Sequence, residues 1–291
     1  MRLRSLGDCV LTTPALALLK KSRPRLQIAM VVEPRFRAIF ENNPDVDELL
    51  PVEVSALRGW RPDLCLNFHG GTRSAWLTAA SGAGLRAGFV HFRHQFIYNL
   101  RIPRAQEILQ VDRTVHTAEH LASAMFWLGL PVSEIPPAKL VAREGHANAS
   151  QPRRPLAVIH PAAATAEKTW RADGFIAVAE NLQAAGIEPV FIGAQSSELT
   201  PFGKFQTVAE APLEQIKSLL ASATLFVGND SGPAHMAAAF GLPVVVIFGA
   251  SNSAIWGPWR TAAEVVASPA GIEAVTIDQV LGAMARLRVH A

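Results

Sequence analysis

Residues 224–251 read TLFVGNDSGPAHMAAAFGLPVVVIFGAS, and this stretch decides the fold that we predict for the chain. An apolar run over 224–227 leads into the polar turn GNDSGP, a short apolar helix ends at Gly241, and a second apolar run covers 243–248. Pro233 suits the first position of a helix, because the N–H that it lacks has no partner there. The stretch therefore predicts a βαβ unit with two parallel strands.

The start of that helix is suited to binding an anion. Asp230 or Ser231 can cap the free amide groups ahead of the proline. The remaining backbone N–H groups and the positive end of the helix dipole point beyond the carboxyl edge of the strands, where open parallel sheets bind ligands. Together with His235, these side chains can hold ribose hydroxyls, phosphates or a sugar. The alternative is a capped core helix that binds nothing.

Alternating strands and helices on both sides of a proline-rich segment predict two domains. A chain of 291 residues exceeds a typical single core. Residues 129–155 are rich in proline and small polar residues and lack a long periodic element, so we interpret them as the linker. We predict an α/β fold of two doubly wound parallel domains, residues 1–145 and residues 146–291.

The first domain begins with MRLRSLGDCVLTTPALALLKK. Residues 4–8, which end at Asp8, are predicted to form a glycine-containing turn, and a helix is expected to start at residues 12–14. Only residues 1–3 are available for the strand that precedes such a turn, so that strand is predicted to be a stub or the remainder of a longer one. A second loop at the same sheet edge carries His69, which either faces a substrate or is only a hydrogen-bonded turn residue.

Composition indicates a globular protein, and we expect it in the cytoplasm. Nearly half of the residues are apolar. The longest apolar runs, such as 244–248, are far shorter than the ~20 residues of a membrane-spanning helix, and no signal peptide is recognised. Cys9 and Cys65 form no CxxC pair and have no histidine cluster nearby, so we predict neither a disulfide framework nor a zinc site. Both cysteines are expected to be buried.

Positive charge is concentrated in the first domain. The net charge is +3, but residues 1–145 contain 18 Lys/Arg against 13 Asp/Glu, whereas residues 146–291 contain 9 against 11. This asymmetry indicates either an anionic partner, such as a phosphorylated lipid at a membrane surface, or arginines scattered over solvated faces. Residues 91–104, HFRHQFIYNLRIPR, combine basic and aromatic residues and either bind an acceptor or form an irregular loop. No nucleic-acid-binding module accompanies them, so we predict no nucleic-acid partner.

Several motifs that carry chemistry are missing from the sequence or lack their context. There is no GxxxxGK[ST] loop, no GxGxxG fingerprint and no GxSxG elbow, which argues against an ATPase, a dinucleotide oxidoreductase and an α/β-hydrolase. The DVD sequence at residues 45–47 lies in a loop without a phosphate-binding context. His116 and His120 are four residues apart in HTAEH, but they lack the HExxH arrangement and a third ligand. We therefore predict no metal site.

The candidate ligand residues of the second domain are expected to converge on one crevice. Lys168 follows the first predicted strand of this domain, Glu198 follows the second, and Asp230 follows the third. In a doubly wound sheet these strand ends open on the same side. A lysine beside a helix start suits a diphosphate, and a carboxylate suits the diol of a ribose.

Three segments of the chain together resemble a known family. They are LGDCVLTTPALALLK near the start, HPAAATAEKTW in the middle and GNDSGPAHMAAAFGLPVVVIFGAS toward the end. In this order they resemble glycosyltransferase family 9, the bacterial ADP-heptose:lipopolysaccharide heptosyltransferases. The resemblance implies a GT-B architecture of two Rossmann-like domains facing across a cleft, the first receiving the acceptor and the second holding the nucleotide sugar. It also implies an inverting transfer that needs no metal and no cofactor, since the nucleotide sugar is a substrate.

The resemblance further implies roles for individual residues. Asp8 matches the proposed general base, Lys168 a phosphate contact, and Glu198 a carboxylate on the ribose. Binding of the nucleotide sugar is implied for the segment that contains Asp230, Ser231, Gly232 and His235. These roles are chemically consistent, because transfer needs a base for the acceptor hydroxyl and cations or dipoles for the departing diphosphate. Asp8 has an alternative role as a helix or turn cap.

The implied partners are a nucleotide-sugar donor similar to ADP-heptose and an anionic lipid or oligosaccharide acceptor of the lipopolysaccharide core type. Peripheral contact with the inner membrane surface is expected to accompany such an acceptor. Two other functions are considered. One is a nucleotide-sugar-binding module whose catalysis is impaired by the truncated first strand, and the other is an NDP-sugar epimerase on the same two-domain fold.

Overall fold

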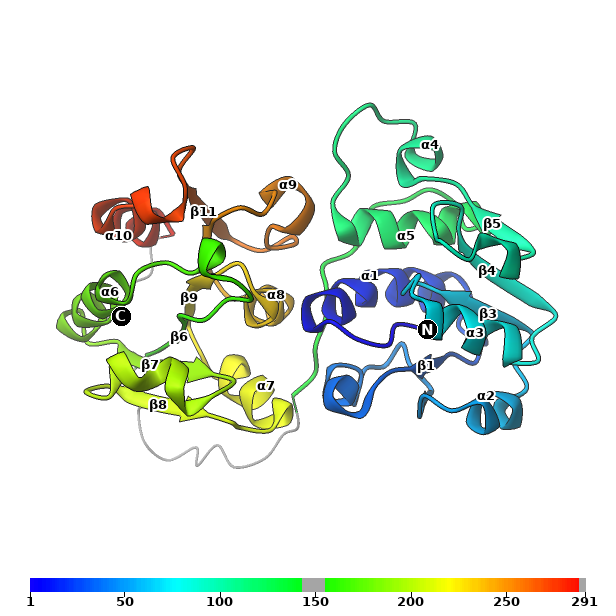
Figure 1. Cartoon of the computed structure of the whole chain (residues 1–291), viewed down its shortest axis with the longest axis horizontal. Coiled ribbons are helices and arrows are strands. Elements are labelled where there is room, and N and C mark those ends of the chain that lie inside the picture. The colour runs from blue at the N-terminus through cyan, green and yellow to red at the C-terminus, as the bar shows by residue number, and fades with distance from the viewer. Residues whose placement is uncertain (143–154, 288–291) are drawn as a thin grey trace. The chain divides into compact units, whose positions relative to one another are not determined.

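The computed structural model describes residues 1–142 and 155–287 (Figure 1). The chain divides into two compact units, Met1–Lys139 and Leu140–Ala291. The division predicted after residue 145 lies outside the described residues. Every strand pair in both units is parallel, as the alternation of strands and helices predicts. Among the described residues, no helix has the length and apolar character needed to cross a membrane.

Unit 2 contains one continuous sheet of six strands in the order β11-β10-β9-β6-β7-β8. The strands are β6 (Leu156–His160), β7 (Glu188–Gly193), β8 (Gln206–Ala209), β9 (Leu225–Asn229), β10 (Val244–Phe248) and β11 (Ala263–Ala267). From β6 the chain first adds β7 and β8 on one side and then crosses to add β9, β10 and β11 on the other. The strand order therefore reverses between β6 and β9, the place where doubly wound sheets bind ligands.

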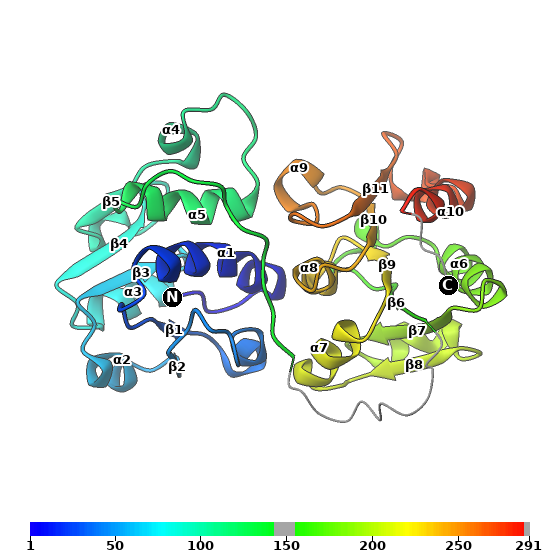
Figure 2. The ribbon, with the colours of Figure 1, turned by 180° about the vertical axis from the view of Figure 1, so that it is seen from behind.

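Helices cover both faces of this sheet. They are α6 (Ala172–Ala184), α7 (Leu213–Ala221), α8 (Gly232–Ala239), α9 (Ser253–Trp256) and α10 (Ile277–Arg286), with short 3-10 turns η3 (Ala166–Lys168), η4 (Ser196–Phe202) and η5 (Ile272–Ala274). The helices α6 and α10 pack together on one face, and α7 and α8 pack together on the other (Figures 1 and 2). The main core lies beneath α6 and α10.

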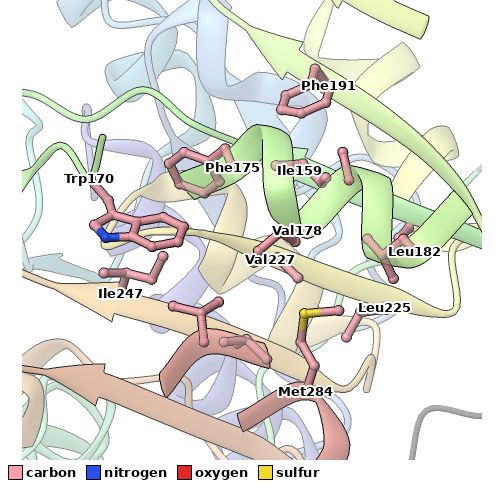
Figure 3. Packing of buried hydrophobic residues seen from close by; sticks show 14 of the residues in the cluster. Ile159, Trp170, Phe175, Val178, Leu182, Phe191, Leu225, Val227, Ile247 and Met284 are labelled. Atoms are coloured by element: carbon pink, nitrogen blue, oxygen red, sulfur yellow. The ribbon is translucent and has the colours of Figure 1, made fainter. Parts of the chain in front are cut away.

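Alternate residues of the central strands form that core. Ile159, Val227 and Ile247 come from three neighbouring strands and meet Phe175 of α6, and all four are fully buried (Figure 3). Because successive side chains of a strand point to opposite faces, the residues between them line the other face. Trp170 closes one end of the core, where its indole N–H donates to the carbonyl oxygen of Val275 at 2.9 Å.

Unit 1 has two groups of hydrogen-bonded strands, β1-β2 and β3-β4-β5. The strands are β1 (Ala29–Val31), β2 (Glu48–Leu50), β3 (Leu64–Asn67), β4 (Leu85–Phe89) and β5 (Leu100–Ile102). The helices are α1 (Leu6–Ser22), α2 (Val54–Trp60), α3 (Thr72–Ala80), α4 (Ala105–Leu109) and α5 (Thr117–Trp127), with 3-10 turns η1 (Pro34–Ile39) and η2 (Gln95–Ile97). The helices α1 and α5 lie side by side (Figures 1 and 2).

The first three residues join the two groups of strands. The N–H of Arg2 donates to the carbonyl oxygen of Val31 at 3.2 Å, on the β1 side. On the β3 side, the nitrogen of Met1 donates to the carbonyl of Leu66 at 2.7 Å, and the Met1 carbonyl accepts from the N–H of Phe68 at 2.9 Å. Residues 1–3 thus occupy the place of a central strand, although they are too short to form a regular one.

The prediction that the first helix starts at residues 12–14 is wrong. Helix α1 begins at Leu6, so Gly7 and Asp8 belong to its first turn and Pro14 lies inside the helix. Proline lacks the N–H that would bond to the carbonyl oxygen of Val10. The hydroxyl of Thr13 donates to that same oxygen at 2.8 Å and replaces the missing bond. This compensation explains how the helix continues through the proline.

Candidate functional site

Two loops of unit 2 begin side by side at the point where the strand order reverses. In the register of β6 and β9, His160 is paired with Gly228, so the loop after β6 and the loop after β9 leave the sheet next to each other. The first of these loops carries Lys168, and the second leads into α8. The predicted meeting of these segments at one sheet edge follows from this register.

Asn229 holds the loop after β6 against the end of β9. Its carbonyl oxygen accepts from the backbone N–H of Trp170 at 3.0 Å, and its amide donates to the carbonyl of Pro161 at 2.6 Å. The side chain is fully buried, and the two bonds fix both ends of the loop that contains Lys168. Sequence reasoning missed this role, because Asn229 reads as one more polar residue of the turn GNDSGP.

Lys168 lies beside Asp230. The ammonium nitrogen is 3.5 Å from a carboxylate oxygen, and the side chains of Lys168 and Asp230 are 32% and 10% exposed. The backbone of the loop that carries Lys168 also packs closely against Gly249. A Cβ atom added to Gly249 would lie 2.0 Å from the carbonyl oxygen of Glu167, so only glycine fits there without moving the loop. The position of the lysine is therefore set by backbone contacts as well as by its carboxylate partner.

Ser231 precedes α8 and contacts His160 rather than capping the helix. Its hydroxyl oxygen is 3.0 Å from Nδ1 of His160, and it makes no side-chain cap. Burial lowers the pKa of His160 to about 4, so the imidazole is neutral at neutral pH. Among the described residues, no hydrogen-bond acceptor contacts the backbone N–H groups of Ser231 and Gly232. The helix start thus presents free donors beside Lys168, as an anion site requires.

The other two side chains predicted to bind the nucleotide sugar are those of His235 and Glu198. His235 is buried within α8, with 5% of its surface exposed. Glu198 lies beyond β7, the other neighbour of β6, where one of its carboxylate oxygens accepts from the N–H groups of Ala194 and Gln195 at 2.8 and 3.2 Å. Glu198 therefore shapes its own loop. The structure brings Lys168, Asp230 and Ser231 together with His160, and it places Glu198 at the adjacent strand end.

Asp8 occupies the corresponding sheet edge in unit 1. It lies in the first turn of α1, where the helix dipole favours a negative charge, and its carboxylate forms an ion pair with the guanidinium of Arg2. Arg2 also donates to the carbonyl of Phe68. Ser5, just before the helix, has φ 73°, a left-handed conformation that costs a non-glycine residue roughly 1–3 kcal/mol. This strained turn directs the chain from residues 1–3 into α1.

His69 lies near the Arg2–Asp8 pair. Its backbone N–H donates to the side-chain oxygen of Asn67 at 2.9 Å, so it is held in a turn. Burial lowers the pKa of its imidazole, and the positive charges of Arg2 and Arg4 lower it further. The Nδ1 atom is buried and has no hydrogen-bond partner among the described residues. A neutral histidine with a free nitrogen therefore lies beside the candidate base.

The two sequences considered as metal motifs have structural roles. Asp47 accepts from the ammonium of Lys20 at 2.7 Å and from the N–H of Ile28 at 2.7 Å. His116 caps α5 through the N–H of Ala118 at 3.1 Å. No group of three or more His, Cys, Asp or Glu residues suited to a metal ion occurs in residues 1–142 and 155–287.

The chain is similar to known proteins of one family. Residues 54–278 match the family model of glycosyltransferase family 9 (heptosyltransferase). The lipopolysaccharide heptosyltransferase 3 of Escherichia coli is 27% identical over 289 residues, which cover 87% of this chain and 83% of that protein. A family 9 glycosyl transferase from Veillonella parvula superimposes with a TM-score of 0.85 at 22% identity, covering 98% of this chain and 94% of the other. Escherichia coli ADP-heptose lps heptosyltransferase II gives a TM-score of 0.82 at 20% identity, with 99% and 98% covered.

The chain belongs to glycosyltransferase family 9. It is a glycosyltransferase, and the predicted α/β fold with parallel sheets is confirmed by the similar structures. The family resemblance inferred from three sequence segments is likewise confirmed.

Proposed function

We propose that the protein transfers a heptose from ADP-heptose, or a closely similar nucleotide sugar, to an acceptor of the lipopolysaccharide core. Membership of family 9 and similarity to a lipopolysaccharide heptosyltransferase over most of both chains support this substrate class. They do not favour an NDP-sugar epimerase or a binding module without catalysis. The expected setting is the cytoplasm, at the inner face of the membrane that carries the acceptor.

The proposal depends mainly on the cluster of a lysine and free backbone N–H groups at the start of α8. Lys168 and the free N–H groups of Ser231 and Gly232 supply positive charge and donors where the two loops meet. A diphosphate that accepts hydrogen bonds from these N–H groups neutralises part of the charge on Lys168, and Asp230 keeps that lysine in place before the donor binds. We therefore assign the nucleotide sugar to unit 2, within the predicted range 146–291.

His160 has a positioning role in this scheme. With its proton on Nδ1, the neutral imidazole donates to the oxygen of Ser231 and leaves the serine O–H free to donate to a phosphate oxygen. We assign ribose contact to the second carboxylate oxygen of Glu198, because the first is engaged by its own loop. His235 completes the set of residues that the family resemblance implies for donor binding.

We assign the acceptor to unit 1, with Asp8 as the general base. In the proposed step, Asp8 takes the proton of the acceptor hydroxyl, whose oxygen attacks the anomeric carbon from the side opposite the diphosphate. The bond from that carbon to the diphosphate oxygen breaks, and the electron pair leaves with the oxygen. Lys168 and the α8 donors stabilise the resulting charge, so the transfer inverts the configuration and needs no metal. Arg2 orients the carboxylate of Asp8.

The test is transfer of heptose from ADP-heptose to a heptose-deficient core oligosaccharide, followed by mass spectrometry and by NMR of the new glycosidic bond. Asp8→Asn should lower kcat by roughly 10²–10⁴-fold, the usual contribution of a general base, with ADP affinity within about twofold of the wild type. The control is Asp112→Asn, an exposed carboxylate of the same unit. Retained activity in Asp8→Asn would show that Asp8 is not the general base. If the wild type does not consume ADP-heptose, the proposed function is refuted.

A further inference from the structure

Residues 64–106 carry an unusual charge pattern. They contain five arginines and no aspartate or glutamate, and the nearest acidic residues in sequence are Asp63 and Glu107. The segment comprises β3, α3, β4, η2 and β5. Solvated surfaces of small domains mix both signs of charge, whereas this segment is basic throughout. Among the described residues, an acidic partner is found only for Arg73, which lies 3.6 Å from Glu33.

Two large aromatic side chains are exposed on the same segment. Trp76 on α3 is 56% exposed, and Phe96 on η2 is 66% exposed. Their sequence neighbours Ala75 and Ile97 belong to one small buried cluster, so the two elements pack against each other. The outer face of α3, which a solvated helix usually fills with charged residues, therefore presents an indole next to the turn that presents a phenyl ring.

The turn that carries Phe96 is anchored in the core and contacted by two arginines. Ile97 and Tyr98 anchor it in the core, and the tyrosine hydroxyl accepts from the amide of Asn67 at 2.8 Å. The guanidinium of Arg86 donates to the carbonyl of Ile97 at 3.0 Å, and that of Arg101 donates to the carbonyl of Tyr98 at 3.4 Å. Phe96 is thus held outward by its neighbours, with positive charge beside it.

We propose that Trp76 and Phe96, together with the arginines of residues 64–106, form a docking surface for an anionic lipid bilayer. Indole and phenyl rings insert at the level of lipid head groups, and arginines bind anionic phosphates through their planar forks. A protein partner with an apolar surface would leave the absence of acidic residues over 64–106 unexplained, whereas an anionic bilayer matches both the aromatic rings and the charge.

The surface lies at the same sheet edge as the proposed base. Its role in bringing the acceptor to the enzyme rests on the proposed function. The helix α3 follows the carboxyl end of β3, and η2 follows the carboxyl end of β4, so both belong to the same sheet edge as Asp8. A bilayer bound there holds a lipid-linked acceptor near the proposed base. Docking would raise the local acceptor concentration without any change in the chemistry.

The experiment is co-sedimentation of the full chain with vesicles of phosphatidylcholine containing phosphatidylglycerol, compared with phosphatidylcholine alone. Wild type should partition into the anionic vesicles, and the double variant Trp76→Ser/Phe96→Ser should bind at least about tenfold more weakly. Leu26→Ser/Val132→Ser is the matched control, since it removes two apolar side chains of unit 1 that are 44% and 72% exposed. Arg93→Gln, at an exposed arginine of the patch, should weaken binding and reduce its salt dependence.

A second measurement does not depend on the double variant. Brominated lipids should quench tryptophan fluorescence of the wild type, and Trp76→Phe should remove that quenching. Equal vesicle binding by wild type and double variant, or no binding by the wild type, would overturn the docking surface. A concentration-dependent dimer that the double variant converts to monomer would assign the face to a second copy of the chain instead.

Transfer to a soluble, lipid-free acceptor separates this inference from the proposed function. The double variant should transfer to that acceptor at the wild-type rate, because neither aromatic residue belongs to the proposed catalytic group. Vesicle binding without any transfer by the wild type would refute the proposed function and leave the docking surface standing. Transfer without vesicle binding would support the proposed function and refute the docking surface.

Discussion

The two units hold their candidate site residues in different ways. In unit 2 the sheet is continuous, and a buried asparagine, Asn229, fixes the loop that carries Lys168. In unit 1 the paired strands fall into two groups joined by residues 1–3, and Asp8 is held by Arg2 from that same short segment. The proposed donor side is therefore supported by a continuous sheet and by two hydrogen bonds of a buried side chain. The position of the proposed base depends on a few residues, and substitutions there should affect structure and catalysis together.

The charge distribution of the two units differs as well. Unit 1 includes the acid-free residues 64–106, whereas the described part of unit 2 has no comparable basic segment. In unit 2 the important cation, Lys168, is paired and partly buried. This difference matches the proposed roles of the two units, a site for a small anionic ligand in unit 2 and a charged docking surface on unit 1. Substitutions and titrations in each unit test how far this contrast extends.

Leu3→Ala should destabilise unit 1 by about 2–5 kcal/mol, because it removes a fully buried leucine from the core. Leu3 packs in one cluster with Val31 of β1 and Cys65 of β3, beneath α2 and α3. Amide hydrogen exchange should accelerate in β1 and β3 and remain unchanged in β6 and β9. Leu26→Ala, at an exposed leucine, is the control and should cost less than about 0.5 kcal/mol. Equal costs would show that residues 1–3 do not join the two groups of strands.

Much of unit 2 can be predicted from the sequence because its signals are local. In residues 224–251, an apolar run, a turn with Pro233 and a second apolar run each specify one element, and the structure has β9, α8 and β10 there. The prediction missed β11, since AEVVA is a short edge strand with only one buried residue and no clear alternation. It also missed α2 and α4, which are too short to show helical periodicity.

The parts of the site that sequence reasoning missed depend on long-range contacts. Asn229 and Trp170 are far apart in the chain, and nothing in either segment shows that one accepts from the other. The same holds for His160 and Ser231. The true start of α1 was hidden because Pro14 predicts a helix start, and the compensating bond from Thr13 becomes visible only in three dimensions. Local patterns and the family resemblance suggested the candidate residues, but they did not reveal what positions them.

Gly249→Ala tests the support of the donor side. The new Cβ would lie 2.0 Å from the carbonyl oxygen of Glu167 and 3.1 Å from Cα of Lys168, so the loop must move. Overpacking of this kind costs about 1–3 kcal/mol, and displacement of Lys168 should weaken ADP binding roughly tenfold in calorimetry. Gly203→Ala is the control, because its Cβ meets only ordinary contacts, the nearest at 3.8 Å. Unchanged ADP affinity in Gly249→Ala would show that Lys168 does not contact the diphosphate.

The dependence of stability on pH compares one histidine in each unit. The pKa of His120 in unit 1 and that of His160 in unit 2 are both lowered to about 4, mainly by burial. Between pH 6.5 and 4 the unfolded chain binds a proton that the folded histidine does not bind. Stability should therefore fall as the pH falls through this window, by at most roughly 1.4 kcal/mol per pH unit for each histidine, and be fully present above pH 6.5. His120→Gln and His160→Gln should each reduce this slope in denaturant titrations.

Salt should distinguish the two histidines, because their pKa values are lowered for partly different reasons. The positive charges of His91 and Arg2 contribute to the low pKa of His120, whereas burial alone lowers that of His160. Added salt screens charges and leaves the desolvation of a buried ring unchanged. In NMR titrations the pKa of His120 should therefore rise with ionic strength, and that of His160 should not move. Equal shifts would mean that charge lowers both pKa values to the same extent. The difference in charge between unit 1 and unit 2 would then not extend to these two buried rings.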